Sequence, residues 1–251
     1  MKAKKSYRIW FSQRNGSTLL CKGLEQTGIA GIPGEYFNIF DSNSLCEHYK
    51  VSTWNELRDK LWSLGTSKNG VFGIKHNMTA SIYREIATLK GISEGEPIDE
   101  EQLVQDLFPN CKHIFLTRRN KVRQAVSWWK AIKDNQWHLE PNQQHENEAD
   151  FYEEHYDFDA LTHLYKEAAL RECAIQAHYT KHGIQPLTLV YEDFVKDFKN
   201  TIKQIIDYLD IEYDQLNIKE MYYQKTANQD SEKWVQRFRE DLQKDWDKKI
   251  W

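Results

Sequence analysis

Residues 7–18 read YRIWFSQRNGST, an apolar run that leads into a short polar loop. A helical pattern formed by Leu19, Leu20 and Leu24 follows at once and ends at Gly28. A strand, a glycine-containing loop and a helix in this order can form an anion site. The first N–H groups of the helix have no partner within it, and the helix dipole places positive charge beside them. The segment therefore predicts a site for a phosphate-bearing ligand.

The loop carries several groups that could hold a phosphate. Gly16 permits a tight turn against a ligand, and the Arg14 guanidinium offers a fixed fork of N–H donors. The loop differs from a nucleoside-triphosphatase P-loop, which needs four residues between its glycines and then Gly-Lys-Ser/Thr. Taken alone, it could also be an ordinary strand–helix turn with a capping serine. The candidate ligand contacts are the six loop residues Gln13, Arg14, Asn15, Gly16, Ser17 and Thr18.

Composition bounds the class of protein. The 251 residues suit one α/β domain, and the net charge of −4 provides no overall basic field that would recruit nucleic acid. The four cysteines are scattered and form neither a Cys-X-X-Cys pair nor a Cys/His cluster, so we expect no metal site and a reducing, cytoplasmic location. No stretch approaches the roughly 18 uninterrupted apolar residues of a membrane span, and no signal peptide is recognisable.

Strand-like runs alternate with helical patterns along the chain. We expect strands at 7–12, 70–75, 113–117 and 187–191, and helices at 17–27, 79–90, 120–133, 160–181 and 198–209. Such alternation predicts βαβ units around a mostly parallel central sheet flanked by helices, in a single domain over residues 1–251. Residues 91–101 are expected to form a surface loop. The polar, acidic segment 134–158 is expected to be either a lid on the acceptor side or a solvated excursion.

The carboxy-terminal region carries large apolar side chains at helical spacing. A helix with this pattern would either bury against the core or form a homodimer contact, and the sequence does not distinguish the two. The residues concerned are Trp234, Phe238, Leu242, Trp246 and Ile250.

A second cationic segment follows the strand expected at 113–117. Arg119 opens an amphipathic helix, and Ser127 lies about two turns further along it. Cations at the amino end of a helix interact unfavourably with the helix dipole. A bound anion is the simplest explanation for their presence there. Arg119 and Ser127 would then hold a second phosphate, unless the basic turn is merely solvated.

Three segments, in order, resemble motifs of sulfotransferases that use 3′-phosphoadenosine 5′-phosphosulfate (PAPS). The first loop resembles their 5′-phosphosulfate loop, a basic residue followed by X-Gly-Ser/Thr-Thr, although many members have lysine in place of Arg14. Residues 119–127 resemble Arg-Asn-Pro-x-Asp-x-x-Val-Ser, whose arginine and serine hold the 3′-phosphate. Residues 191–193 resemble a Tyr-Glu-Asp element whose tyrosine, here Tyr191, lies near the nucleotide. The resemblance implies a sulfotransferase fold similar to the P-loop-containing nucleoside triphosphate hydrolases, with PAPS as cofactor, PAP as product and no metal.

Departures from the pattern concern the second motif and the catalytic base. Lys121 and Arg123 replace the proline and the aspartate of the motif. Cytosolic sulfotransferases place a histidine two residues after a lysine at the end of the second strand. Here Lys75 supplies the lysine, but Asn77 stands at the histidine position. His76 cannot simply substitute, because neighbouring strand residues point to opposite faces.

A turn after the first helix offers another base. Residues 31–37 read GIPGEYF, with Glu35 presented between Gly34 and Tyr36. Together with the first loop and residues 230–238, this turn resembles the bacterial trehalose 2-sulfotransferase family. In that family the glutamate of the turn is the proposed general base, which implies the same role for Glu35. Without the resemblance, a helix-capping or solvated loop carboxylate would be the default interpretation.

The resemblance implies transfer of a sulfuryl group from PAPS to a hydroxyl of a small carbohydrate-type acceptor, such as trehalose or a related sugar or glycolipid. Glu35, Arg14 and Lys75 would be the catalytic residues. Aromatic residues are more often core residues, so each acceptor contact is a weaker prediction. Two alternatives stay open: a small-molecule kinase with an aberrant P-loop, and a non-catalytic nucleotide-binding protein of the same fold. The predicted acceptor contacts are Glu35, Tyr36, Trp128 and Trp137.

Overall fold

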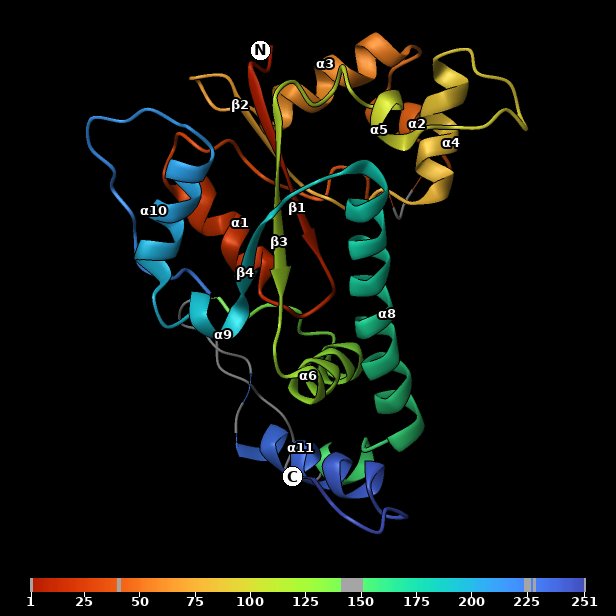
Figure 1. Ribbon diagram of the computed structural model, residues 1–251, viewed down its shortest axis with the longest axis vertical. Coiled ribbons are helices and arrows are strands. Elements are labelled where there is room, and N and C mark those ends of the chain that lie inside the picture. Colours follow the sequence, from red (N-terminus) through yellow and green to blue (C-terminus); the bar gives the residue numbers. More distant parts are fainter. Residues whose placement is uncertain (1, 40–41, 141–150, 224–226, 228, 251) are drawn as a thin grey trace.

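A four-stranded sheet forms the centre of the computed structural model, which describes residues 2–39, 42–140, 151–223, 227 and 229–250. Its strands lie in the order β2-β1-β3-β4, and each pair of neighbours is parallel. The parallel sheet expected from the sequence is therefore confirmed (Figure 1). The strands are β1 (Lys5–Phe11), β2 (Val71–Lys75), β3 (Cys111–Thr117) and β4 (Leu187–Val190).

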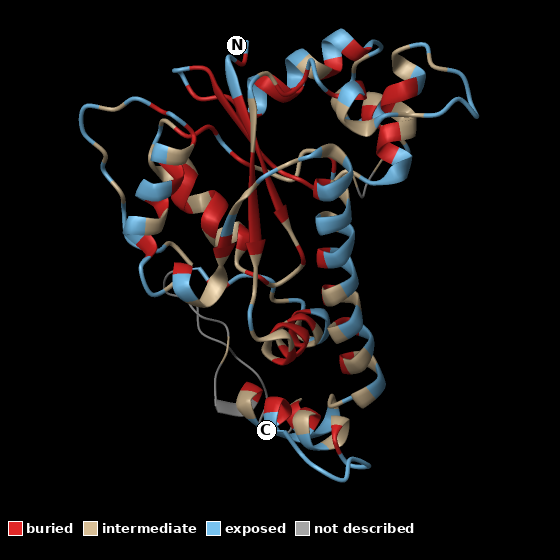
Figure 2. Ribbon diagram, viewed as in Figure 1, coloured by how far each residue is buried: buried red, intermediate tan, exposed pale blue. Residues whose placement is uncertain are grey.

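Helices cover both faces of the sheet, because the central strands carry apolar side chains on both sides. On one face, Ile9 and Ile114 belong to the cluster that packs against α1 (Ser17–Gln26) and α10 (Phe198–Tyr208). On the other face, Trp10 and Phe115 pack against Tyr179 of α8 (Phe158–His182). Figure 1 shows α1 and α10 on one side of the strands and α8 on the other. Figure 2 shows long buried stretches in β1, β2 and β3.

Four further helices pack around a separate apolar cluster beyond β2. They are α2 (Leu45–Tyr49), α3 (Trp54–Gly65), α4 (Ala80–Leu89) and α5 (Glu100–Leu103). A capping box begins α3: Thr53 accepts the N–H of Glu56, and the Glu56 carboxylate accepts the N–H of Thr53. The surface loop expected at 91–101 is found at residues 91–99, and α5 starts at Glu100.

The segment predicted as a lid, residues 134–158, is only partly described. Residues 141–150 lie outside the described residues, α6 (Lys121–Asp134) precedes them, and α7 (Phe151–Glu154) follows them. Tyr152 of α7 is buried against Trp234 of α11 (Gln229–Leu242). A short helix, α9 (Tyr191–Phe194), follows β4 directly. Across the described ranges, none of the helices combines the length and apolar character needed to cross a membrane.

The carboxy-terminal helix α11 packs on its own chain. Trp234 and Phe238 are buried in a cluster with Val122 of α6 and Leu161 of α8. Trp246 and Ile250 follow the helix and are 50% and 63% exposed. Of the two alternatives for this region, the contacts of Trp234 and Phe238 favour burial in the core.

Replacing Phe238 by alanine should lower the free energy of unfolding by about 3–5 kcal/mol, because the change leaves a cavity in this cluster. Urea titration of the parent and the variant measures the difference. The matched control is Trp246→Ala, which should change stability by less than about 0.5 kcal/mol because its side chain is half exposed. A destabilisation that varied with protein concentration would contradict packing within one chain.

Candidate active site

The loop between β1 and α1 lies at the carboxyl end of the sheet, where parallel α/β proteins bind their ligands. Gly16, the residue before α1, has a φ of +89°, in the left-handed region that favours glycine. A Cβ atom at Gly16 would lie 2.4 Å from Cδ2 of Tyr191. The Tyr191 ring therefore packs directly on the loop glycine, so two of the three predicted motifs meet here.

Side-chain contacts fix the shape of this loop. Asn15 is fully buried; its side chain donates to the carbonyl oxygen of Leu116 and accepts the N–H of Ser17 at 3.2 Å. Gln124 of α6 donates to the carbonyl oxygen of Gln13 at 2.7 Å. The side chains of Asn15 and Gln124 thus hold the loop, and the backbone N–H groups of Gly16 and Thr18 are candidate anion ligands at its turn.

Two arginines lie close together beside the loop. Arg14 donates from Nε to Oγ of Ser127 at 3.0 Å and also donates to the carbonyl oxygen of Trp137. Arg118 donates to the carbonyl oxygen of Arg14 at 3.0 Å, and its guanidinium lies 4.8 Å from the centre of the Tyr191 ring. Burial and the neighbouring Arg118 lower the pKa of Arg14 to about 10, and burial also lowers the pKa of Arg118. Adjacent, partly buried cations of this kind favour a bound anion.

Glu35 and Lys75 form an ion pair at the same end of the sheet. Lys75 Nζ lies 2.5 Å from Oε1 of Glu35 and donates to Oγ1 of Thr18 at 3.2 Å. The turn that carries Glu35 is held against β2, because the N–H of Lys75 donates to the carbonyl oxygen of Gly34 at 2.9 Å. The predicted carboxylate and the predicted lysine therefore meet beside the first turn of α1.

His76 lies on the opposite face of the sheet from Lys75. Its ring is buried and stacks on Trp10 with a centroid separation of 3.8 Å. Burial, together with the charge of Arg8, lowers the pKa of His76 well below its usual value. This placement agrees with the strand alternation used in the sequence analysis.

Arg119 points away from the loop and toward α9. Its Nη2 lies 2.6 Å from Oδ2 of Asp193, and its side chain is 61% exposed. The backbone N–H groups of Arg119 and Asn120 donate to the Glu192 carboxylate at 2.9 and 3.0 Å. Among the described residues, Ser127 contacts Arg14 and not Arg119. The two predicted ligands of a second phosphate therefore flank the site without contacting each other.

The predicted acceptor residues differ in their surroundings. The hydroxyl of Tyr36 donates to the carbonyl oxygen of Ile32, and its ring stacks on Phe72. Trp128 is buried between α6 and α8, where packing is its evident role. Trp137 remains 39% exposed next to Arg14.

His138, which follows Trp137 in the sequence, also borders the site. Its neighbour Trp137 accepts a hydrogen bond from Arg14 through the backbone carbonyl, and burial with the charges of Arg14 and Lys75 lowers the pKa of His138 to about 4. The His138 ring lies 5.1 Å from the ring of Tyr223. The chain that precedes residue 141 thus reaches the site through Trp137 and His138.

The assembled site combines two chemical capacities. The positive region formed by Arg14, Arg118 and the loop N–H groups fits a phosphate or a phosphosulfate. Beside it, the Glu35 carboxylate could accept a proton and Lys75 could stabilise negative charge. Within the part of the chain that the structure describes, no group of three or more His, Cys, Asp or Glu side chains could hold a metal ion.

The chain is similar to several known proteins. Two trehalose 2-sulfotransferases, from Mycolicibacterium smegmatis and Mycobacterium tuberculosis, are each 24% identical to the chain. The first alignment covers 96% of both proteins; the second covers 95% of this chain and 96% of the relative. Similar solved structures include a sulfotransferase from Alicyclobacillus acidocaldarius (TM-score 0.48, 12% identity, 96% of this chain and 93% of that one). The sulfotransferase domain of the Synechococcus PCC 7002 olefin synthase gives a TM-score of 0.37 at 14% identity, over 95% of this chain and 96% of that one.

The family assignment rests on a match over most of the chain. A family model described as Stf0 sulphotransferase matches residues 6–241, from β1 to α11. That range contains the loop, the Glu35 turn, the α6 segment and the Tyr191 element. The chain therefore belongs to the Stf0 sulphotransferase family.

Proposed function

We propose that the protein transfers a sulfuryl group from PAPS to a hydroxyl of a small carbohydrate, trehalose or a related sugar or glycolipid. One observation carries the proposal: Glu35 and Lys75 form an ion pair that contacts Thr18, beside the cationic loop. A carboxylate that can accept a proton thus stands next to a site for an anion. Family membership supports sulfotransferase activity, and the names of the two relatives support a sugar acceptor.

The residues of the two arginine-containing segments fit the charges of PAPS. The 5′-phosphosulfate would be held by Arg14, Arg118 and the N–H groups of Gly16 and Thr18, with the Tyr191 ring against the same turn. Arg119 and Ser127 would hold the 3′-phosphate, which requires Arg119 to share or exchange its contact with Asp193. When bound, PAPS supplies the sulfuryl group on its 5′-phosphate.

In the proposed reaction one bond to sulfur forms, another breaks, and one proton is transferred. The acceptor oxygen bonds to sulfur, the bond from sulfur to the 5′-phosphate oxygen breaks, and its electron pair stays on that oxygen. Glu35 would take the proton of the acceptor hydroxyl, a role typically worth about 10²–10⁴-fold in rate. Lys75, which contacts both Glu35 and Thr18, would stabilise charge that develops at the departing oxygen.

The acceptor would enter beside the Glu35 turn and residues 137–138. Tyr36 and Trp137 offer partly exposed aromatic surface there, and His138 lies near Arg14 and Lys75. Trp128 is a weaker contact because its side chain is buried between two helices.

Incubation of the purified protein with PAPS labelled in its sulfuryl group, and with a panel of sugars and alcohols that includes trehalose, tests this function. We expect label in a sugar product together with release of PAP. Consumption of ATP in the presence of Mg²⁺ would instead support a kinase. Tight binding of PAP with no labelled product from any acceptor would support a non-catalytic nucleotide-binding protein.

Arg119→Ala should weaken the binding of PAP by about tenfold or more, because it removes a charge-assisted contact to the 3′-phosphate. The same change should leave the affinity for adenosine 5′-monophosphate unaltered, since that ligand has no 3′-phosphate. Calorimetry with both ligands measures the two effects. Arg237→Ala serves as a control, because Arg237 is also an exposed arginine with a carboxylate neighbour, Glu153. Equal affinity of parent and variant for PAP would rule out Arg119 as a ligand of the 3′-phosphate.

A further inference from the structure

A buried carboxylate joins the elements that carry the two halves of the proposed nucleotide site. Glu172 lies in α8 and is only 7% exposed. It accepts hydrogen bonds from Oγ of Ser12 at 2.9 Å, from Oγ1 of Thr117 at 2.8 Å and from Nζ of Lys121 at 2.6 Å. These three donors stand after β1, at the end of β3 and at the start of α6. One side chain therefore ties the phosphate loop, a central strand and the second cationic helix to α8.

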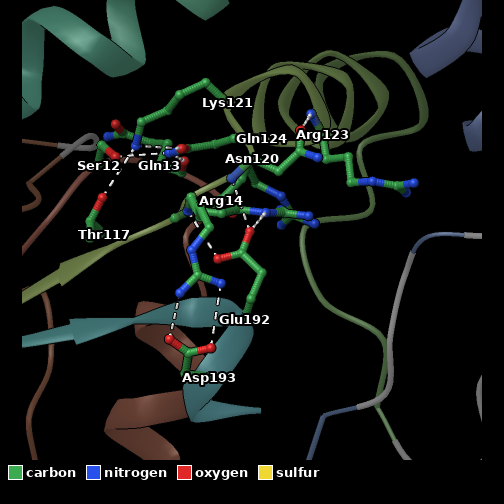
Figure 3. A network of polar contacts seen from close by, with 12 residues as sticks. Ser12, Gln13, Arg14, Thr117, Asn120, Lys121, Arg123, Gln124, Glu192 and Asp193 are labelled. Atoms are coloured by element: carbon green, nitrogen blue, oxygen red, sulfur yellow. Dashed lines mark hydrogen bonds and ion pairs between the residues drawn. The ribbon is translucent and has the colours of Figure 1, made fainter. Parts of the chain in front are cut away.

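Gln124 closes the same network from the side of α6. It is fully buried, and its Nε2 donates to Oγ of Ser12 at 2.8 Å and to the carbonyl oxygen of Gln13 at 2.7 Å (Figure 3). Its Oε1 lies 3.3 Å from Nζ of Lys121. Gln124 and Ser127 are three residues apart on a helix and so lie on neighbouring positions of one face. The network thus fixes the helix that carries Ser127 directly to the backbone of the loop that carries Arg14.

Burying a charged network of this kind costs free energy, which is hard to explain if its only role is to stabilise the fold. Burying a carboxylate requires a partner and several hydrogen bonds, and well-packed apolar residues often stabilise a core equally well or better. Such networks can instead specify geometry, because their hydrogen bonds depend on distance and direction. In this one, the Lys121 ammonium is directed to Glu172 and the carboxylate faces Ser12 and Thr117. None of these side chains is needed as a phosphate ligand.

We propose that Glu172 is a positioning residue that sets the separation between the loop at residues 12–18 and the segment of α6 that carries Ser127. This inference rests on the proposed function, in which the loop holds the 5′ group and the α6 segment holds the 3′-phosphate. A ligand with both phosphates gains affinity from simultaneous contact with both halves, and it loses that gain when their separation changes. A ligand with one phosphate contacts one half and is insensitive to the separation.

The test compares three nucleotides on the parent and on Glu172→Gln. The nucleotides are PAP, adenosine 5′-monophosphate and adenosine 3′-monophosphate, with affinities from calorimetry or competition. We expect the affinity for PAP to fall by about tenfold or more, while each monophosphate changes by less than about twofold. Lys121→Met keeps the aliphatic stem but removes Nζ, and it should give the same pattern of affinities. This second variant keeps the test possible if Glu172→Gln does not fold.

A control and three contrary outcomes complete the test. Glu101→Gln removes another carboxylate that is paired with a buried arginine, Arg8, and it should alter none of the three affinities. Equal losses for all three nucleotides, or unchanged affinities with only a lower unfolding temperature, would overturn the positioning role. Failure of the parent itself to bind PAP would overturn the nucleotide assignment of the proposed function, and the positioning role with it.

Discussion

Replacing Glu35 by glutamine is expected to lower the turnover number of sulfuryl transfer by about 10²–10⁴-fold. The amide has the same size as the carboxylate and still reaches Lys75, but it cannot take the proton of the acceptor hydroxyl. Glu35 does not lie among the loop N–H groups or the arginines, so the affinity for PAP should stay close to that of the parent. The labelled-PAPS assay with a productive sugar gives the turnover, and calorimetry gives the affinity for PAP.

The comparison needs a carboxylate that is paired with a lysine but lies away from the site. Asp207 meets this need, because it pairs with Lys203 at 2.7 Å on the exposed side of α10. Asp207→Asn should leave turnover unaltered. If Glu35→Gln turned over as fast as the parent, a group other than Glu35 would have to accept the proton of the acceptor hydroxyl. The role of the Glu35–Lys75 pair would then be limited to binding.

The sheet could be predicted from the sequence because each strand is an apolar run bounded by polar or turn-forming residues. The expected run at 113–117, for example, is found as Cys111–Thr117, and the run at 70–75 as Val71–Lys75. Helix α3 was missed although its Thr53-x-x-Glu56 capping box is a recognisable start signal. Its apolar residues pack against α4 and α5 in a cluster that no local pattern specifies.

Part of the site could also be predicted from a local sequence pattern. Alternation along β2 was enough to separate Lys75 from His76, since successive strand residues face opposite sides. The neighbouring arginines, Arg118 and Arg119, follow no such rule because they lie at a turn from strand to helix. Their directions depend on two acidic residues. Glu192 accepts the backbone N–H groups of Arg119 and Asn120, and Asp193 forms an ion pair with the Arg119 guanidinium. Both acidic residues come from a segment more than 70 positions later in the chain.

Arg14→Met is expected to lower kcat/KM for PAPS by about 10²–10³-fold, the effect of removing one preorganised charge donor in a buried site. Arg14 is the residue in which the two halves of the proposed nucleotide site meet. Its backbone belongs to the loop, and its side chain donates to Ser127 of α6. Burial and Arg118 lower its pKa to about 10, so it carries its positive charge throughout the neutral range. Methionine keeps much of the aliphatic length and removes the whole charge.

Arg14→Lys separates charge from geometry in this prediction. Lysine keeps the positive charge but has no planar fork and cannot hold Ser127 and a phosphate in fixed directions at once. We therefore expect Arg14→Lys to lie between the parent and Arg14→Met in kcat/KM for PAPS. If the lysine variant were as poor as the methionine variant, the directed hydrogen bonds of the guanidinium would matter more than its charge. If the methionine variant kept the full kcat/KM, the second arginine, Arg118, would have to supply the stabilisation, and Arg14 would only join the loop to α6.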